Sequence, residues 1–190
     1  MINEAYDQFD RPCRDLYLMN LCFEVATKSI DPNTKCGCVF VDDAGGILST
    51  GYNGPIRNAI DDNIPINNEE KYAFLEHSER NSIYNAARVG TPLNKSIVYI
   101  TGFPCIDCLR GIVQVGAVKV VYGPLQPKMC SSPEYLSIYS KMLVGVPITI
   151  RRFKFDEELF KLQPGLEDKC KTRNDIKLEF SSSGKKAYII

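Results

Sequence analysis

The sequence predicts a three-layer α/β/α fold built on a mixed five-stranded sheet. Short apolar runs alternate with segments of helical period, a turn rich in Asp and Gly joins the first two apolar runs, and helical stretches separate the later ones. A short turn joins antiparallel strands, whereas a helical crossover joins parallel strands. We therefore expect an antiparallel first pair of strands followed by parallel ones.

The first elements are a helix and a hairpin. Apolar residues recur at helical spacing from Asp15 to Lys28, and the turn-forming residues 31–34 end this helix. The apolar runs 36–41 and 47–52 lie on either side of the Asp/Gly turn and predict a hairpin of two buried strands. Residues 53–72 are polar and contain two prolines, which predicts a loop or a partly helical insertion.

Three helices and three strands follow in alternation. We expect the helices at 77–88, from Pro104 onward and at 133–143. We expect the strands at 97–101, 118–122 and 146–153. Pro104 suits the start of its helix because proline is favoured in the first turn, where no amide hydrogen is needed.

Length and charge restrict the class of protein. The 190 residues predict one domain over residues 1–155, and residues 156–190 form a C-terminal extension to which the sequence assigns no role. Lys plus Arg equals Asp plus Glu at 23 each, which argues against a nucleic-acid partner. There is neither a secretion signal nor an apolar stretch of about 20 residues, so we expect no membrane association and a cytoplasmic location.

One histidine and two cysteines have a spacing suited to a catalytic zinc. His77 is the only histidine, and Cys105 and Cys108 share one face of the helix that Pro104 opens. A catalytic zinc has three protein ligands and leaves its fourth position to water, whose pKa it lowers toward neutrality. The helix dipole also stabilises the two thiolates. We therefore predict that Zn²⁺ is the cofactor and that these three residues bind it.

Glu79 is the predicted catalytic acid–base. It lies two residues beyond His77, where its carboxyl group can reach over the metal without binding it. A carboxyl group in that place can take a proton from the activated water and pass it to a substrate.

The same residues have other possible interpretations. A single histidine is more often a core or surface residue, and one C-x-x-C is also found in redox pairs and in structural zinc sites. A structural site needs a fourth ligand, and the chain has neither a second histidine nor a second C-x-x-C. Cys36 and Cys38 are the nearest rival ligands, but they open an apolar run typical of core residues. The catalytic interpretation is therefore favoured.

Several motifs together carry a family resemblance. They are Asp-Pro-Asn-Thr at 31–34, Lys-Cys-Gly-Cys-Val at 35–39, Gly-Tyr-Asn-Gly at 51–54, His-Ser-Glu-Arg-Asn at 77–81 and Phe-Pro-Cys-Ile-Asp-Cys at 103–108. In order and approximate spacing they resemble the deoxycytidylate deaminases of the cytidine deaminase superfamily. H-x-E followed by P-C-x-x-C is typical of zinc deaminases acting on nucleobases. The resemblance covers roughly residues 15–153, an ordinary domain length, and implies a cytidine-deaminase-like fold.

The resemblance also implies an activity and its regulation. Such an enzyme is a hydrolase that deaminates dCMP to dUMP and ammonia and supplies dUMP for thymidylate synthesis. Family members are commonly homohexamers that dCTP activates and dTTP inhibits, which implies effector contacts at Gly51, Asn53 and Gly54. Asn53, Asn81 and Arg80 become candidate substrate contacts, Arg80 because a guanidinium suits phosphate.

Alternatives remain at the level of the sequence. The substrate of such an enzyme could also be another cytosine nucleotide or nucleoside, or a tRNA adenosine. An alternative of a different class is a catalytically silent zinc module that binds nucleotides or partner chains. Asn53 is equally explained by a left-handed turn, and Arg80 by a solvated surface charge. Two residues depart from the family pattern: Ser78 where alanine is usual, and Gly102 where a larger apolar residue is common.

Overall fold

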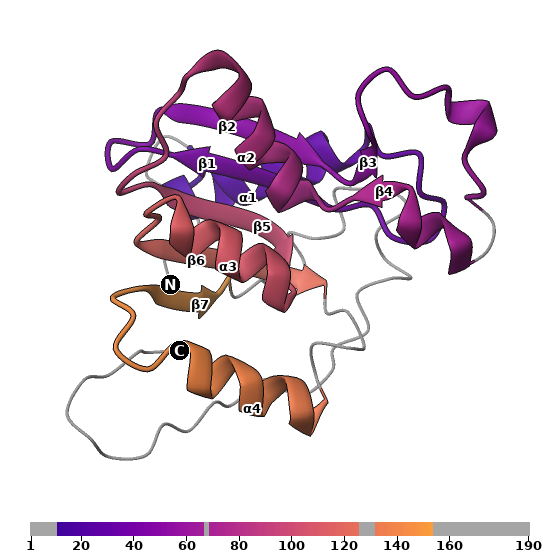
Figure 1. The fold of residues 1–190 in the computed structure, drawn as a ribbon. Helices are drawn as coiled ribbons and strands as arrows, with labels where there is room; N and C mark the ends of the chain where they lie inside the picture. Colours follow the sequence, from indigo (N-terminus) through magenta and orange to yellow (C-terminus); the bar gives the residue numbers. More distant parts are fainter. Residues whose placement is uncertain (1–10, 67–68, 126–131, 154–190) are drawn as a thin grey trace.

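The computed structural model describes residues 11–66, 69–125 and 132–153, and shows helices on both faces of one sheet (Figure 1). The helices are α1 (Arg14–Ala26), α2 (Ser78–Val89), α3 (Ile106–Gln114) and α4 (Pro133–Met142). The strands of the main sheet are β1 (Gly37–Val41), β2 (Ile47–Tyr52), β5 (Ile97–Gly102), β6 (Lys119–Leu125) and β7 (Thr149–Arg152).

The main sheet has the predicted mixed topology. Its strand order is β2-β1-β5-β6-β7. The strand β1 pairs antiparallel with both β2 and β5, whereas the pairs β5–β6 and β6–β7 are parallel. The parallel pairs follow helical crossovers, which confirms the three-layer α/β/α prediction with its five-stranded sheet.

Side chains alternate between two cores, one on each face of the sheet. In β5, Val98 and Ile100 join the core beneath α2, α3 and α4, while Tyr99 joins the core beneath α1. In β1, Phe40 joins the core beneath α2, α3 and α4, and Val39 joins the core beneath α1. This two-residue period explains why the central strands are mostly apolar, since both of their faces are buried.

The insertion between β2 and α2 forms short elements of its own. It contains the 3₁₀ turns η1 (Asp61–Asn63) and η2 (Glu69–Ala73) and a two-stranded sheet of β3 (Gly54–Pro55) and β4 (Leu75–Glu76). The sequence predicted a loop or a partly helical segment, and the short sheet was missed. Because β4 leads directly into His77, this insertion helps to place the first predicted metal ligand.

The last strand is shorter than predicted. The sequence suggested 146–153, but β7 begins at Thr149. Gly145 has a positive φ of 77°, and the amides of Val146 and Ile148 bond to nearby carbonyls, so this stretch turns before pairing can start. The predicted extension at 156–190 lies outside the described residues.

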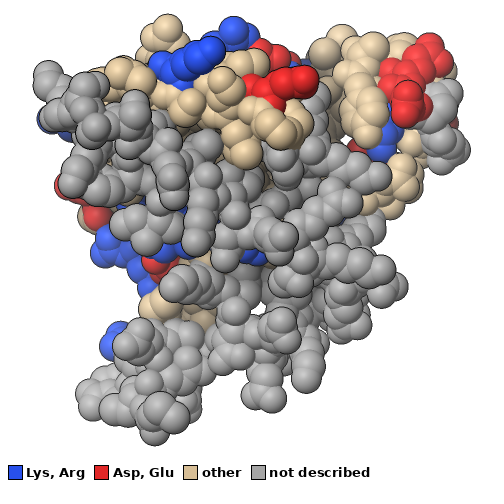
Figure 2. Space-filling model, turned by 90° about the horizontal axis from the view of Figure 1, so that it is seen from below, with Lys and Arg blue, Asp and Glu red and all other residues tan. Residues whose placement is uncertain are grey.

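One face of the molecule shows mixed charge. Seen from below, several of the visible basic and acidic side chains of the described residues lie next to one another (Figure 2). Within the described ranges, every helix is too short or too polar to span a bilayer.

Candidate metal centre

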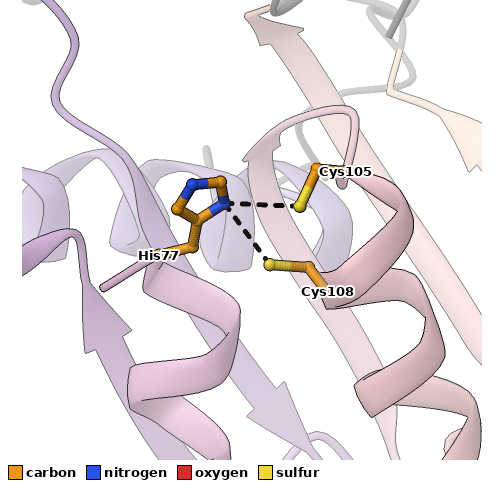
Figure 3. A group of neighbouring side chains, drawn as sticks. All are labelled: His77, Cys105 and Cys108. Atoms are coloured by element: carbon orange, nitrogen blue, oxygen red, sulfur yellow. Dashed lines mark hydrogen bonds between the residues drawn. The ribbon is translucent and has the colours of Figure 1, made fainter. Parts of the chain in front are cut away.

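Two neighbouring helices bring the predicted ligands together. His77 immediately precedes α2 and Cys105 immediately precedes α3, and both have extended backbone angles typical of a residue that caps a helix. Cys108 lies in the first turn of α3. His77 Nδ1 is 3.4 Å from Cys105 Sγ and 3.5 Å from Cys108 Sγ, and Figure 3 shows the ring facing both sulfurs.

These distances suit a zinc ion. Tetrahedral zinc at about 2.0–2.1 Å from nitrogen and about 2.3 Å from sulfur holds the two ligand atoms about 3.5 Å apart. The three donor atoms all lie within 4.8 Å of one another. In the part of the chain that the structure describes, no fourth His, Cys, Asp or Glu joins this cluster. The donor set thus fits a site with three protein ligands and one open position.

The two sulfurs are electrostatically coupled. A hydrogen bond from Cys108, aided by His77 and by the Cys108 amide, lowers the pKa of Cys105 to about 4 despite burial. The same contact with Cys105, together with burial, raises the pKa of Cys108. The pair therefore shares one proton, and binding of a divalent cation would release it.

Glu79 is buried beside this cluster. It is 5% exposed, and the Ser78 hydroxyl donates to its carboxylate at 2.9 Å. Burial raises the pKa of Glu79, although its own amide, His77 and Ser78 favour the charged form. A carboxyl group with a raised pKa titrates closer to neutrality, as an acid–base catalyst requires.

Close backbone packing places α2 on the sheet. A Cβ atom at Gly51 of β2 would lie 2.4 Å from both the Ser78 carbonyl oxygen and the Ser82 amide nitrogen. Only glycine permits this approach, which holds the first turn of α2 against β2. The Ser49 hydroxyl adds a bond to the Ser82 carbonyl at 2.7 Å. The structure thus gives Gly51 a packing role close to the predicted ligands.

Aromatic side chains hold the segment that leads into α3. The Tyr139 hydroxyl on α4 donates to the Pro104 carbonyl at 2.7 Å, immediately before Cys105. The ring of Phe103 packs edge-on against Tyr122 and Tyr139, with centroids 4.9 and 5.2 Å away. Sequence reasoning missed Tyr139, because its helical pattern does not reveal which carbonyl its hydroxyl meets.

The predicted nucleotide contacts are engaged in backbone bonds. Asn53 accepts from the Cys36 amide at 2.7 Å and donates to the Thr34 carbonyl at 2.9 Å, while Asn81 donates to the Tyr52 carbonyl at 2.9 Å. The left-handed turn considered for Asn53 is not present, since the described non-glycine residues with positive φ are Asn58 and Lys95. Gly54 pairs with Glu76 in the small sheet.

Gly102 has a structural explanation. A Cβ there would lie 2.3 Å from the Leu125 carbonyl oxygen, on the paired strand β6. The absence of a side chain at this departure from the family pattern therefore permits close strand pairing.

A buried ion pair that the sequence did not reveal fixes the insertion. Lys71 Nζ lies 2.8 and 2.9 Å from the two carboxylate oxygens of Asp31, and the side chains are 3% and 5% exposed. Asp31 also accepts from the amides of Asn33 and Thr34. The chain leading to His77 is thereby attached to the loop between α1 and β1.

The rival cysteines do not belong to the cluster. Cys38 lies in the core, and burial raises its pKa well above that of an ordinary thiol. Burial, with the nearby Glu79 charge, raises the pKa of Cys36 to about 12. In the described part of the chain, neither sulfur is among the grouped donor atoms of His77, Cys105 and Cys108.

Comparison with known proteins agrees with this arrangement. The family model described as "Cytidine and deoxycytidylate deaminase zinc-binding region" matches residues 13–124. A probable deoxycytidylate deaminase of Drosophila melanogaster is 34% identical over 149 residues, 73% of this chain and 71% of that protein. The deoxycytidylate deaminase of Homo sapiens is 31% identical over 112 residues, 56% of this chain and 62% of the human protein.

Solved structures share the fold. The dCMP deaminase of cyanophage S-TIM5, in its apo form, has a TM-score of 0.59 and 22% identity, over 75% of this chain and 99% of that one. The same phage enzyme, described as a complex with dCMP and dUMP, has a TM-score of 0.58 over 75% of this chain and 98% of the other. This likeness confirms the cytidine-deaminase-like architecture.

Proposed function

The chain belongs to the cytidine and deoxycytidylate deaminase family, and on that premise we propose that it is a zinc-dependent enzyme that hydrolyses dCMP to dUMP and ammonia. One observation carries the proposal: an imidazole nitrogen faces two cysteine sulfurs, and a buried carboxyl group with a raised pKa lies beside them. A structural zinc would not need that carboxyl group.

The metal ligands and Glu79 have different roles in this reaction. His77, Cys105 and Cys108 would hold zinc, which when bound makes a water molecule acidic enough to supply a nucleophile near neutral pH. Glu79 takes a proton from that water and delivers it to N3 of cytosine as oxygen adds at C4. It then carries the second proton to the departing amino group, so that water and dCMP yield dUMP and ammonia.

The Ser78 hydroxyl and burial hold the Glu79 carboxyl group in place for both proton transfers. The Ser78 hydroxyl holds one carboxylate oxygen, and Ser78 itself is fully buried. Exclusion of bulk water strengthens the electrostatic interactions within the site.

The finer assignments are proposals that rest on the family resemblance. Asn53 and Asn81 are candidate substrate contacts, and Gly51, Asn53 and Gly54 candidate effector contacts for dCTP and dTTP. The phosphate contact predicted for Arg80 competes with its ion pair to Glu76. A homohexamer and a cytoplasmic location belong to the same proposal.

Ammonia release from purified protein tests the function. We expect turnover of dCMP to exceed that of CMP, deoxycytidine and a tRNA anticodon stem-loop, to stop with a zinc chelator and to return with added zinc. Protein that carries stoichiometric zinc but releases no ammonia from any of these substrates would instead favour the silent zinc module. Preferential turnover of the stem-loop would indicate an RNA deaminase.

A further inference from the structure

Glu76 and Arg80 form a charged contact at the start of α2. Arg80 Nε donates to Glu76 Oε1 at 2.5 Å, and the guanidinium forms an ion pair with the same carboxylate. The same oxygen accepts from the His77 backbone amide at 3.0 Å. Glu76 thus connects Arg80 to the backbone of the residue whose imidazole faces the two sulfurs.

The guanidinium also faces the second helix. It is close enough to Cys105 and Cys108 to interact electrostatically with both sulfurs. Its Nη1 lies 4.0 Å from Asp107 Oδ2 in the first turn of α3, but that side chain is 60% exposed, so this contact contributes little. The Glu76 and Arg80 side chains are only 22% and 26% exposed, and their contact is better shielded from solvent.

A fixed cation here has an electrostatic use. Two adjacent thiolates repel each other, and the Glu79 carboxylate adds a further negative charge to the same small volume. An arginine stays charged at every relevant pH and lowers the cost of keeping these groups together. At the same time, its bond to Glu76 stabilises the backbone that orients the imidazole.

We propose that Arg80 is a positioning residue of the metal centre: it holds Glu76 against the His77 amide and places a permanent positive charge beside Cys105 and Cys108. This rests on the proposed function only in taking the histidine and the two cysteines as zinc ligands. The role predicts an effect on metal affinity rather than on nucleotide binding.

Zinc affinity of the full chain measures this role. The dissociation constant is obtained by competition with a chelating dye for wild type, Arg80→Gln and Arg80→Lys, with Arg88→Gln as the matched control. Arg88 is exposed in the last turn of the same helix. We expect Arg80→Gln to weaken zinc binding by about 10- to 100-fold, as is typical when a group supporting the ligands is lost. Arg80→Lys should recover part of the affinity, and Arg88→Gln should match wild type.

A second readout separates positioning from substrate contact. With saturating zinc, the KM of Arg80→Gln for dCMP should stay within about threefold of wild type. A raised KM with unchanged zinc affinity would overturn the proposal and assign Arg80 to the substrate phosphate. Wild-type protein that binds zinc but lacks deaminase activity would refute the proposed function, while the comparison of zinc affinities would still decide the role of Arg80.

Glu76→Gln gives an independent check, and it can be measured alone if Arg80→Gln does not fold. It removes the charge that Arg80 binds and should also weaken zinc binding. In the double variant the two losses should not multiply, because both substitutions break the same contact. Independent losses, or a Glu76→Gln protein with wild-type zinc affinity, would contradict the proposed connection.

Discussion

Replacing Lys71 with methionine should lower the free energy of unfolding by about 3–5 kcal/mol, because it leaves a buried carboxylate without its counter-ion. Lys71 Nζ lies 2.8 Å from one oxygen of Asp31 and 2.9 Å from the other, and both side chains are almost fully buried. The remaining donors to this carboxylate are the amides of Asn33 and Thr34, at 2.8 and 3.2 Å.

The magnitude follows from this geometry. At 2.8 Å and an effective dielectric constant of about 20, the two charges attract by about 6 kcal/mol before the cost of desolvating them is subtracted. Methionine is close to lysine in length and apolar, so the substitution removes the charge without opening a large cavity. The main loss is then the unpaired charge of Asp31.

Thermal and urea unfolding, followed by circular dichroism, would measure the effect. For a chain of this size a loss of 3–5 kcal/mol corresponds to a fall in Tm of about 6–20 °C. The double variant with Asp31→Asn keeps an acceptor for the two backbone amides and should recover about 2 kcal/mol of the loss. Lys28→Met, at an exposed lysine, should stay within about 0.5 kcal/mol of wild type.

Two results would contradict this role of the Asp31–Lys71 ion pair. A loss below about 1 kcal/mol for Lys71→Met would mean that the ion pair contributes no more than an exposed one. A double variant no more stable than Lys71→Met would mean that the unpaired carboxylate is not the source of the loss.

Four further predictions concern the site and its support. Glu79→Gln should retain zinc but lose about 10²–10⁴ or more in kcat, and a variant with unimpaired kcat would exclude it as the acid–base. Gly51→Ala should lower the free energy of unfolding by about 1–3 kcal/mol and weaken zinc binding, because the added Cβ would clash with the backbone of α2. Gly111→Ala is the control: its added Cβ would contact only a side-chain methyl group at 3.3 Å, and it should be neutral or stabilising. Tyr139→Phe should cost about 1–2 kcal/mol in urea unfolding by removing the 2.7 Å hydroxyl bond, and a neutral result would contradict that role. Burial alone would raise the pKa of Asp31, but hydrogen bonds from Lys71 and two backbone amides hold this pKa below its ordinary value. The contribution of Asp31 to stability is therefore present above about pH 4 and is lost as the pH falls through the lowered pKa. In acid unfolding, the double variant Lys71→Met, Asp31→Asn should lose less stability than wild type over that range.

The parts of the fold that local pattern determines were predicted from the sequence. The strands β1 and β2 were found because a short turn separates two apolar runs, and α2 and α3 because helical period follows His77 and Pro104. The candidate metal ligands were predicted from a local pattern as well, His-x-Glu followed by Pro-Cys-x-x-Cys, and the structure brings them together at the starts of two helices.

Contacts between distant residues account for what was missed. Asp31 and Lys71 are 40 positions apart, and neither has a local pattern that marks it as buried. The Tyr139 hydroxyl donates to the carbonyl of Pro104, 35 positions away, in the segment that leads into α3. The left-handed turn considered for Asn53 was wrong, because its side chain bonds to the backbone at Cys36 and Thr34, which no local pattern reveals. Its nucleotide contact stays a prediction.

Zinc-edge X-ray absorption on freshly purified, active protein would show whether His77, Cys105 and Cys108 bind zinc. We expect one zinc per chain, with two sulfur neighbours at about 2.3 Å and nitrogen or oxygen neighbours at about 2.0–2.1 Å completing four ligands. His77→Ala should remove a nitrogen neighbour and Cys105→Ser a sulfur neighbour. Active protein without stoichiometric zinc, or a zinc with four sulfur neighbours, would contradict a catalytic zinc held by these three residues.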